Sequence, residues 1–279
     1  MGVARRVLDR IALRRGALHE RRIQDRWLRS TGRFDVDRAF VARHGARVLG
    51  GPFAGMAYPP SAAGRVHHLV AKLLGAYERE LAAVVAEQLA RRPPLFVDVG
   101  AADGYYAVGF AVASPSTRVH AFEVDPVAKR ALRALARLNG AADRVVVHGP
   151  ANPWRLASLD LHGAFVLCDC EGAELDVLAG EAVPALAGAT VLVEVHPLGD
   201  GEGHGDTGPP LRERFEASHT VRAFEPEGRD PDEYPELEGL PGAEDAIDEA
   251  RFGRTSWLLF EPRREAHPPG RGEPHTPSE

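Results

Sequence analysis

From residue 95 onward, short apolar runs alternate with segments of helical spacing, and this alternation limits the fold more than any other feature of the sequence. Strands that alternate with helices predict an α/β fold, with a mostly parallel sheet covered by helices on both faces. An acidic, Pro- and Gly-rich stretch separates the last two strands, which are expected to form the antiparallel edge. The predicted strands are 95–99, 118–123, 144–148, 164–169, 190–194, 220–224 and 255–260, and the predicted helices are 105–112, 126–139, 173–178, 182–186 and 211–218.

The length of 279 residues is enough for one full α/β core with additions, and too small for a second large domain. An apolar stripe predicts that the main domain, residues 63–261, begins with a helix over 65–91. Residues 1–62 are predicted to form an N-terminal extension, in which an Arg-rich helical arm is followed by an irregular segment with a Gly/Pro-rich loop at 50–60.

Two further segments are predicted to lack regular structure. Residues 199–210 contain repeated glycines and end in two prolines, which is typical of a flexible loop. Residues 262–279 have little apolar content, so they are expected to form a disordered tail.

The first 30 residues carry nine arginines against three acidic residues. This pattern predicts a solvated, partly helical arm, and the alternative is a weak contact with an anionic membrane or a partner protein. No apolar run in this segment is long enough for a signal-peptide core or a membrane span. The net charge of -6 argues against nucleic-acid binding over the whole surface.

The chain has two cysteines, Cys168 and Cys170, spaced so that both side chains lie on the same face of a strand. That spacing does not suit a disulfide, and two cysteines are too few for a Cys-rich zinc site. A reducing, cytoplasmic location is therefore expected.

The most informative motif is the segment 96–106, Phe-Val-Asp-Val-Gly-Ala-Ala-Asp-Gly-Tyr-Tyr, in which an apolar strand ends in an acidic turn and opens a helix. Gly100 and Gly104 are expected to let the backbone pass close to a ligand. A dinucleotide site prefers Gly-x-Gly-x-x-Gly, and here Asp98 and Asp103 would repel a pyrophosphate. The acidic turn instead suits the amino group and sulfonium of S-adenosylmethionine, while a tight turn without a ligand is the alternative. The residues predicted to contact the cofactor here are Asp98, Gly100, Ala101, Ala102, Asp103, Gly104 and Tyr105.

The next strand ends at Glu123, 19 positions after Gly104. A carboxylate at this distance can accept hydrogen bonds from both ribose hydroxyls, as an acid does about 20 residues after a dinucleotide turn. We therefore predict that Glu123 binds the cofactor ribose. Asp125 precedes Pro126 at a helix start and is predicted to be a helix N-cap.

Two acidic strings follow later strands: 167–174, Leu-Cys-Asp-Cys-Glu-Gly-Ala-Glu, and 193–197, Val-Glu-Val-His-Pro. In open α/β sheets ligands bind at the carboxyl ends of the strands, so these side chains should converge on the cofactor. Their roles are acceptor binding, proton removal or metal coordination. The candidate catalytic residues are Asp169 and His196, followed by Glu171 and Glu194, and Asp169 is also expected to contact the cofactor. Glu174 is interpreted as a first-turn acid favoured by the helix dipole.

Together, the segments 96–106, 121–123, 169–174 and 194–196 resemble the FkbM-type methyltransferases, whose signature after the fourth strand is Asp-x-Glu-Gly-Ala-Glu. The resemblance covers about residues 95–200. It implies a class I methyltransferase fold with a Rossmann-like sheet and, typically, O-methylation of a hydroxyl on a sugar or secondary metabolite.

Such a reaction mainly requires the acceptor to be aligned with the methyl group, and a hydroxyl acceptor also benefits from a general base. A second hypothesis is a metal-assisted O-methyltransferase that uses Asp169, Glu171, Glu194 and His196, because oxygen ligands plus one imidazole suit Mg²⁺ or Mn²⁺. A third is a non-catalytic protein that kept the cofactor-binding fold, and a fourth is an NAD-dependent enzyme, which the glycine spacing disfavours. A small-molecule acceptor is the expected partner.

Overall fold

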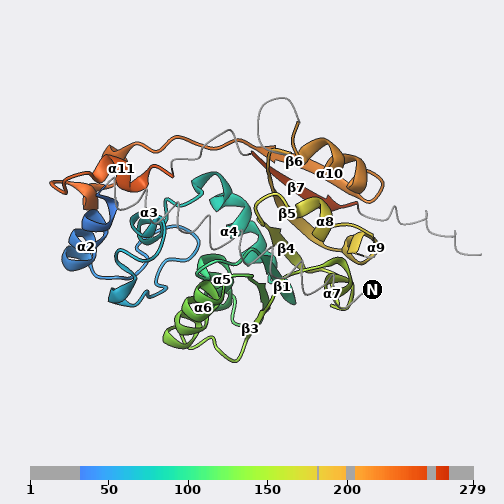
Figure 1. Cartoon of the computed structure of the whole chain (residues 1–279), viewed down its shortest axis with the longest axis horizontal. Coiled ribbons are helices and arrows are strands. Elements are labelled where there is room, and N and C mark those ends of the chain that lie inside the picture. Colours follow the sequence, from blue (N-terminus) through green and yellow to red (C-terminus); the bar gives the residue numbers. More distant parts are fainter. Residues whose placement is uncertain (1–31, 181, 199–204, 250–255, 264–279) are drawn as a thin grey trace, which may run out of the picture.

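The computed structural model describes residues 32–180, 182–198, 205–249 and 256–263 (Figure 1). Their strands form one seven-stranded sheet in the order β3-β2-β1-β4-β5-β7-β6. Strands β1 to β5 are parallel, and β7 pairs antiparallel with both β5 and β6. This confirms the predicted mostly parallel, Rossmann-like sheet, in which β7 is the antiparallel strand. The strands are β1 (Leu95–Val99), β2 (Arg118–Phe122), β3 (Val145–His148), β4 (Phe165–Cys168), β5 (Thr190–Val195), β6 (His219–Phe224) and β7 (Ser256–Pro262).

Helices cover both faces of this sheet because alternate strand residues point to opposite sides. On β1, Phe96 belongs to one hydrophobic cluster and Val97 to the other. The first cluster includes side chains of α4 (Ala82–Arg91), α5 (Tyr105–Ala113) and α6 (Pro126–Leu138). The second includes side chains of α7 (Pro153–Ala157), α8 (Glu174–Val177), α9 (Ala182–Leu186) and α10 (Gly208–Phe215).

The register of the central strands brings their carboxyl ends to one edge. Val99 of β1 pairs with Cys168 of β4, which in turn pairs with Val193 of β5. The strand order also reverses between β1 and β4, because β2 and β3 lie on one side of β1 and the later strands on the other. Ligands of open α/β sheets bind at such a switch point, so the residues that follow β1 and β4 are placed where a site is expected.

The predicted single helix over 65–91 is wrong. The segment forms α3 (Leu69–Leu74), the short η2 (Arg79–Leu81) and α4. Helix α3 ends at Gly75, which has φ 75°, and a Cβ there would lie 2.3 Å from the backbone carbonyl carbon of Gly50. Glu78 is also left-handed, with φ 47°. The apolar stripe is real, but this close approach of two chain segments breaks the helix.

The irregular segment predicted after the N-terminal arm is only partly irregular, since α2 (Arg33–His44) and η1 (Pro60–Ala62) form within it. Helix α2 packs with α3 and with α11 (Ala243–Ile247), away from the sheet (Figure 1). The connection between β6 and β7 crosses the molecule to reach this group and contains η3 (Pro231–Glu233) and η4 (Pro235–Leu237).

The predicted loop 199–210 ends earlier than expected, because α10 begins at Gly208. Pro209 and Pro210 occupy its first turn, where a proline is well tolerated. The Arg-rich arm, residues 199–204 and all but the first residues of the predicted tail lie outside the described residues. Among the helices that are described, none has the length and apolar character needed to span a bilayer.

Candidate active site

The turn after β1 has an unusual backbone, with φ 91° at Gly100, 46° at Ala102 and 96° at Gly104. A Cβ on Gly100 would lie 1.5 Å from the carbonyl oxygen of Asp169, so the ends of β1 and β4 approach too closely for any side chain. A Cβ on Gly104 would lie 2.7 Å from Cγ of Leu132 in α6. Both glycines are therefore required by the packing of the protein itself, and the expected close approach of a ligand stays a prediction.

Glu123 holds this turn from the end of β2. Its buried carboxylate accepts hydrogen bonds from the N–H groups of Ala102, at 2.8 Å, and Asp125, at 2.6 Å. The N–H groups of Gly100 and Ala101 both donate to the carbonyl of Phe122. Burial raises the pKa of Glu123, and the hydrogen bonds from the backbone act in the opposite direction. Each carboxylate oxygen keeps a further lone pair for a ligand.

Asp125 forms the helix N-cap that the sequence predicts. Its carboxylate accepts hydrogen bonds from the N–H groups of Val127, at 2.8 Å, and Ala128, at 3.4 Å, and Pro126 begins α6. The cap fixes the start of α6 directly after Glu123.

Asp98 on β1 is nearly inaccessible, and its Oδ2 has no hydrogen-bond partner among the described residues. Burial, and next the charge of Glu123, raise its pKa to about 8. A buried carboxyl with an unsatisfied oxygen is stabilised by any hydrogen-bond donor placed next to it, and most by a cationic one. Asp98 therefore has one buried oxygen for which the described residues supply no hydrogen-bond donor.

Asp103 is engaged by the protein on both oxygens. Lys72 of α3 donates to Oδ1 at 2.5 Å, and the Tyr58 hydroxyl donates to Oδ2 at 2.8 Å. The ion pair with Lys72 compensates the charge that was expected to attract a cationic ligand. The ring of Tyr105, the first residue of α5, packs edge-on against Phe53 rather than standing in open space. Sequence reasoning missed Lys72, although a lysine inside the apolar string Leu-Val-Ala-Lys-Leu-Leu is a recognisable signal.

The acidic residues after β4 and β5 lie close together around His196, whereas their expected convergence on the cofactor stays a prediction. Its Nδ1 lies 3.1 Å from Oε1 of Glu174, and its Nε2 lies 3.3 Å from Oε2 of Glu194. Nε2 is also 3.6 Å from Oε2 of Glu171 and 3.8 Å from Oδ1 of Asp169. The contact between Nδ1 and Glu174 is an ion pair when the imidazole is protonated. Four carboxylates therefore surround one imidazole.

Glu174 has a larger role than the helix-dipole interpretation gives it. It is fully buried, and its Oε1 accepts hydrogen bonds from the N–H groups of Cys170, at 3.0 Å, and Gly172, at 3.1 Å. In the turn that these hydrogen bonds close, Glu171 and Gly172 adopt the left-handed conformation, with φ 56° and 92°. Glu174 thus anchors the turn after β4 and pairs with His196 at the same time. Thr207 fixes His196 in turn, because its hydroxyl accepts the His196 N–H at 3.1 Å.

The cluster shifts the titration of its members. Burial lowers the pKa of His196, but the neighbouring carboxylates, Glu174 foremost, have the larger, opposite effect. The result is a pKa raised to about 9. His196 is therefore a cation at neutral pH. Burial and the charge of Glu194 raise the pKa of Asp169 well above its usual range. One ligand atom each from Asp169, Glu194 and His196 lie within 4.8 Å of one another, a spacing that could hold a metal ion.

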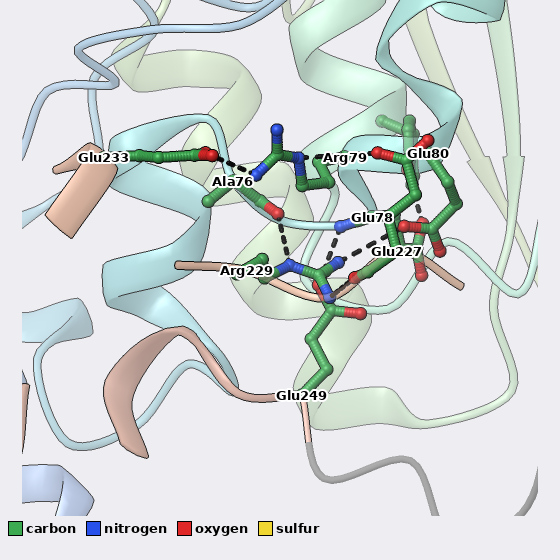
Figure 2. A network of polar contacts seen from close by, with 9 residues as sticks. Ala76, Glu78, Arg79, Glu80, Glu227, Arg229, Glu233 and Glu249 are labelled. Atoms are coloured by element: carbon green, nitrogen blue, oxygen red, sulfur yellow. Dashed lines mark hydrogen bonds and ion pairs between the residues drawn. The ribbon is translucent and has the colours of Figure 1, made fainter. Parts of the chain in front are cut away.

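A second charged network ties the β6–β7 connection to the segment before α4 (Figure 2). The buried Arg229 contacts Glu249 at 2.5 Å and Glu80 at 3.4 Å, and its Nε donates to the carbonyl of Ala76 at 2.8 Å. Glu249 also accepts the N–H of Glu78 at 2.7 Å. The connection is thereby fastened beside the tyrosines that begin α5, since the Tyr106 hydroxyl donates to Glu78.

Trp257 of β7 is a residue that sequence reasoning missed. It is fully buried, and it is the cross-strand partner of Glu194. Its indole N–H has no hydrogen-bond partner within the described segments. Trp257 therefore leaves one buried donor unsatisfied on the strand that pairs with Glu194.

Neither a protein-family model nor a curated protein sequence matches this chain. Among solved structures, it is similar to the O-methyltransferase TomG from Streptomyces achromogenes in complex with SAM, with 18% identity, a TM-score of 0.44, and coverage of 67% of this chain and 80% of that one. A SAM-dependent methyltransferase from Geobacter sulfurreducens in complex with S-adenosyl-L-homocysteine gives 14% identity, a TM-score of 0.40, and coverage of 66% and 91%. A precorrin-6y C5,15-methyltransferase from Geobacter metallireducens gives 15% identity and a TM-score of 0.42, with coverage of 64% of this chain and 87% of that one. Likenesses this weak assign no reaction, which has to rest on the site itself.

Proposed function

We propose that the protein is an S-adenosylmethionine-dependent methyltransferase that acts on a hydroxyl group of a small molecule, such as a sugar or a secondary metabolite. The observation that carries the proposal is the pair of buried carboxylates at the β1–β2 edge. Glu123 has lone pairs left for two ribose hydroxyls, and Asp98 has an unsatisfied oxygen for an amino group. The FkbM-like string after β4 supports the same function and suggests the sugar or metabolite acceptor.

The cofactor, when bound, supplies a methyl group already activated by its sulfonium. The protein's part is to align the acceptor and to take its proton. Asp169 is proposed as the base, because it lies at the switch point and its side chain is 25% exposed. Its raised pKa brings it closer to the range in which a base works at neutral pH. His196, as a cation, is proposed to hold the surrounding carboxylates in place.

Replacement of Glu123 with alanine is expected to weaken S-adenosylhomocysteine binding by about 1.5–3 kcal/mol, because charge-assisted hydrogen bonds to the ribose are lost. Calorimetric titration of wild type and variant measures this difference. Asp125→Asn is the matched control, since it removes the neighbouring charge but keeps an acceptor for the N-cap. Equal affinity of Glu123→Ala and wild type would remove Glu123 from the ribose site.

A second version of the function uses a divalent metal, and the specific observation in its favour is the spacing of Asp169, Glu194 and His196. Two carboxylates and an imidazole suit Mg²⁺ or Mn²⁺, which would lower the pKa of an acceptor hydroxyl. In this version the metal replaces the proton on His196.

The two versions predict different responses to EDTA in a methyl-transfer assay. In the metal version, chelation abolishes turnover and added Mg²⁺ or Mn²⁺ restores it, because the acceptor loses its Lewis acid. In the direct-base version, turnover does not change. Zn²⁺ added in place of Mg²⁺ is a useful control, since restoration by Zn²⁺ alone would contradict the assignment of a hard metal.

Two further proposals concern the setting of the protein. The proposed location is reducing and cytoplasmic, because the sequence has two cysteines whose spacing along one strand does not suit a disulfide. The proposed partner is the small-molecule acceptor rather than a nucleic acid, because the net charge is -6 and the site is lined by carboxylates. For the Arg-rich arm, a solvated segment stays the prediction, with a weak contact to an anionic membrane or a partner protein as the alternative.

A further inference from the structure

We propose that Lys72 is a positioning residue for the cofactor: together with Tyr58 it grips Asp103 and so fixes the shape of the turn after β1. The inference rests on the proposed function, because that turn is the proposed cofactor site. It adds two residues, Lys72 and Tyr58, that lie 31 and 45 positions before Asp103 in sequence.

The grip on Asp103 is complete and buried. Lys72 Nζ lies 2.5 Å from Oδ1 and the Tyr58 hydroxyl 2.8 Å from Oδ2, so each carboxylate oxygen has its own donor. The side chains of Lys72 and Asp103 are 5% and 14% exposed. Burial and the neighbouring Asp103 raise the pKa of Tyr58 well above its usual range, so Tyr58 remains a donor under all ordinary conditions.

Lys72 is itself held in place. All residues of α3 are buried, and the helix ends where Gly75 meets the backbone of Gly50. The ammonium lies 5.0 Å from the ring centroid of Tyr77 and 5.8 Å from that of Tyr105, where the ring faces attract a cation. Because Tyr105 directly follows the turn, Lys72 contacts both the turn and the start of α5.

The turn requires such support because three of its five residues are left-handed, and Ala102 at φ 46° adopts this conformation despite its Cβ. Phe122 and Glu123 hold it from the sheet. Lys72 and Tyr58 hold it through Asp103 from the N-terminal part of the chain. A turn that is held both from the sheet and from the N-terminal part of the chain loses little conformational entropy when a ligand binds, and this favours affinity.

A buried ion pair is a poor way to gain stability, because apolar residues of similar volume often stabilise a fold as well or better. What a buried ion pair does provide is a defined geometry. Here the two donors, Lys72 and Tyr58, fix the orientation of the Asp103 carboxylate. If the pair served stability alone, removing both charges together would be harmless. If it positions the turn, the same change would restore stability without restoring cofactor affinity.

This contrast gives the experiment. Lys72→Met and the double variant Lys72→Met/Asp103→Asn are compared with wild type in calorimetric titration with S-adenosylhomocysteine and in denaturant unfolding. The asparagine keeps an acceptor for Tyr58 and removes the uncompensated charge. We expect both variants to bind about tenfold more weakly, equivalent to 1.4 kcal/mol, while the double variant regains most of the unfolding midpoint lost by the single one. Recovery of affinity together with the midpoint would overturn the proposal.

Arg229→Met is the matched control, because it removes the cation of another buried ion network (Figure 2). It should lower the unfolding midpoint and leave affinity within about twofold, a margin set by the usual context dependence of such contacts. If wild type does not bind S-adenosylhomocysteine, the proposed function fails, and amide exchange without ligand still decides this inference. Lys72→Met should then accelerate exchange at Ala102 and Gly104, and unchanged protection there would overturn it.

Discussion

Replacement of Gly100 with alanine is expected to lower the free energy of unfolding by about 2–5 kcal/mol and to abolish cofactor binding. Two effects add. The left-handed backbone at φ 91° disfavours a Cβ, and the Cβ would lie 1.5 Å from the carbonyl oxygen of Asp169. Neither strand end can move freely, because the N–H of Asp169 donates to the carbonyl of Val99 at 2.9 Å.

Denaturant unfolding monitored by circular dichroism measures the effect, and Gly140→Ala is the control. Gly140 is also left-handed, with φ 63°, but no atom lies within 4 Å of the added Cβ. It should therefore cost only the backbone strain, about 1–2 kcal/mol. Equal destabilisation by the two substitutions would show that the ends of β1 and β4 do not approach as closely as described.

Replacement of Asp169 with asparagine is expected to lower turnover by about 10²–10⁴-fold, the usual contribution of a positioned base, while cofactor affinity changes little. Asparagine has the same shape and keeps the backbone contact with Gly100, but its amide cannot take the proton from the hydroxyl of the methyl acceptor. Because the pKa of Asp169 is raised, the wild-type turnover should increase as pH rises through that pKa, where the carboxylate becomes available. The variant should lose this dependence.

Steady-state methyl transfer with labelled cofactor measures both quantities. His196→Ala should also lower turnover, because it removes the cation among the four carboxylates. Glu171→Gln is the comparison, since its side chain is 64% exposed and its effect should be small. Unchanged turnover in Asp169→Asn and His196→Ala would make these strand ends structural, and the base would then have to be sought near 50–60 or 199–210.

Features set by local pattern were predicted correctly from the sequence. Apolar strings bounded by glycine and proline identified the strands of the sheet, and a proline after Asp125 identified its N-cap. The convergence of Asp169, Glu194 and His196 followed from one general property, that parallel strands end at the same edge.

Features set by contacts between distant segments were not predicted. The break at Gly75 depends on the backbone of Gly50, which no periodicity within 65–91 reveals. Asp103 forms an ion pair with Lys72, which lies far away in the sequence. Because the local sequence does not reveal this partner, the turn was expected to carry more negative charge than it does. The role of Glu174 as an anchor depends on a left-handed pair of residues whose conformation the sequence string leaves open.

The most direct test of the proposed methyltransferase function is a pair of calorimetric titrations of the wild-type protein, one with S-adenosylhomocysteine and one with NADH. Asp98 and Glu123 should bind the amino group and ribose of S-adenosylhomocysteine, whereas the turn lacks the Gly-x-Gly-x-x-Gly spacing that a pyrophosphate prefers. We therefore predict saturable binding of S-adenosylhomocysteine and weaker or no binding of NADH. Tighter binding of NADH, or no binding of S-adenosylhomocysteine, would contradict the proposal.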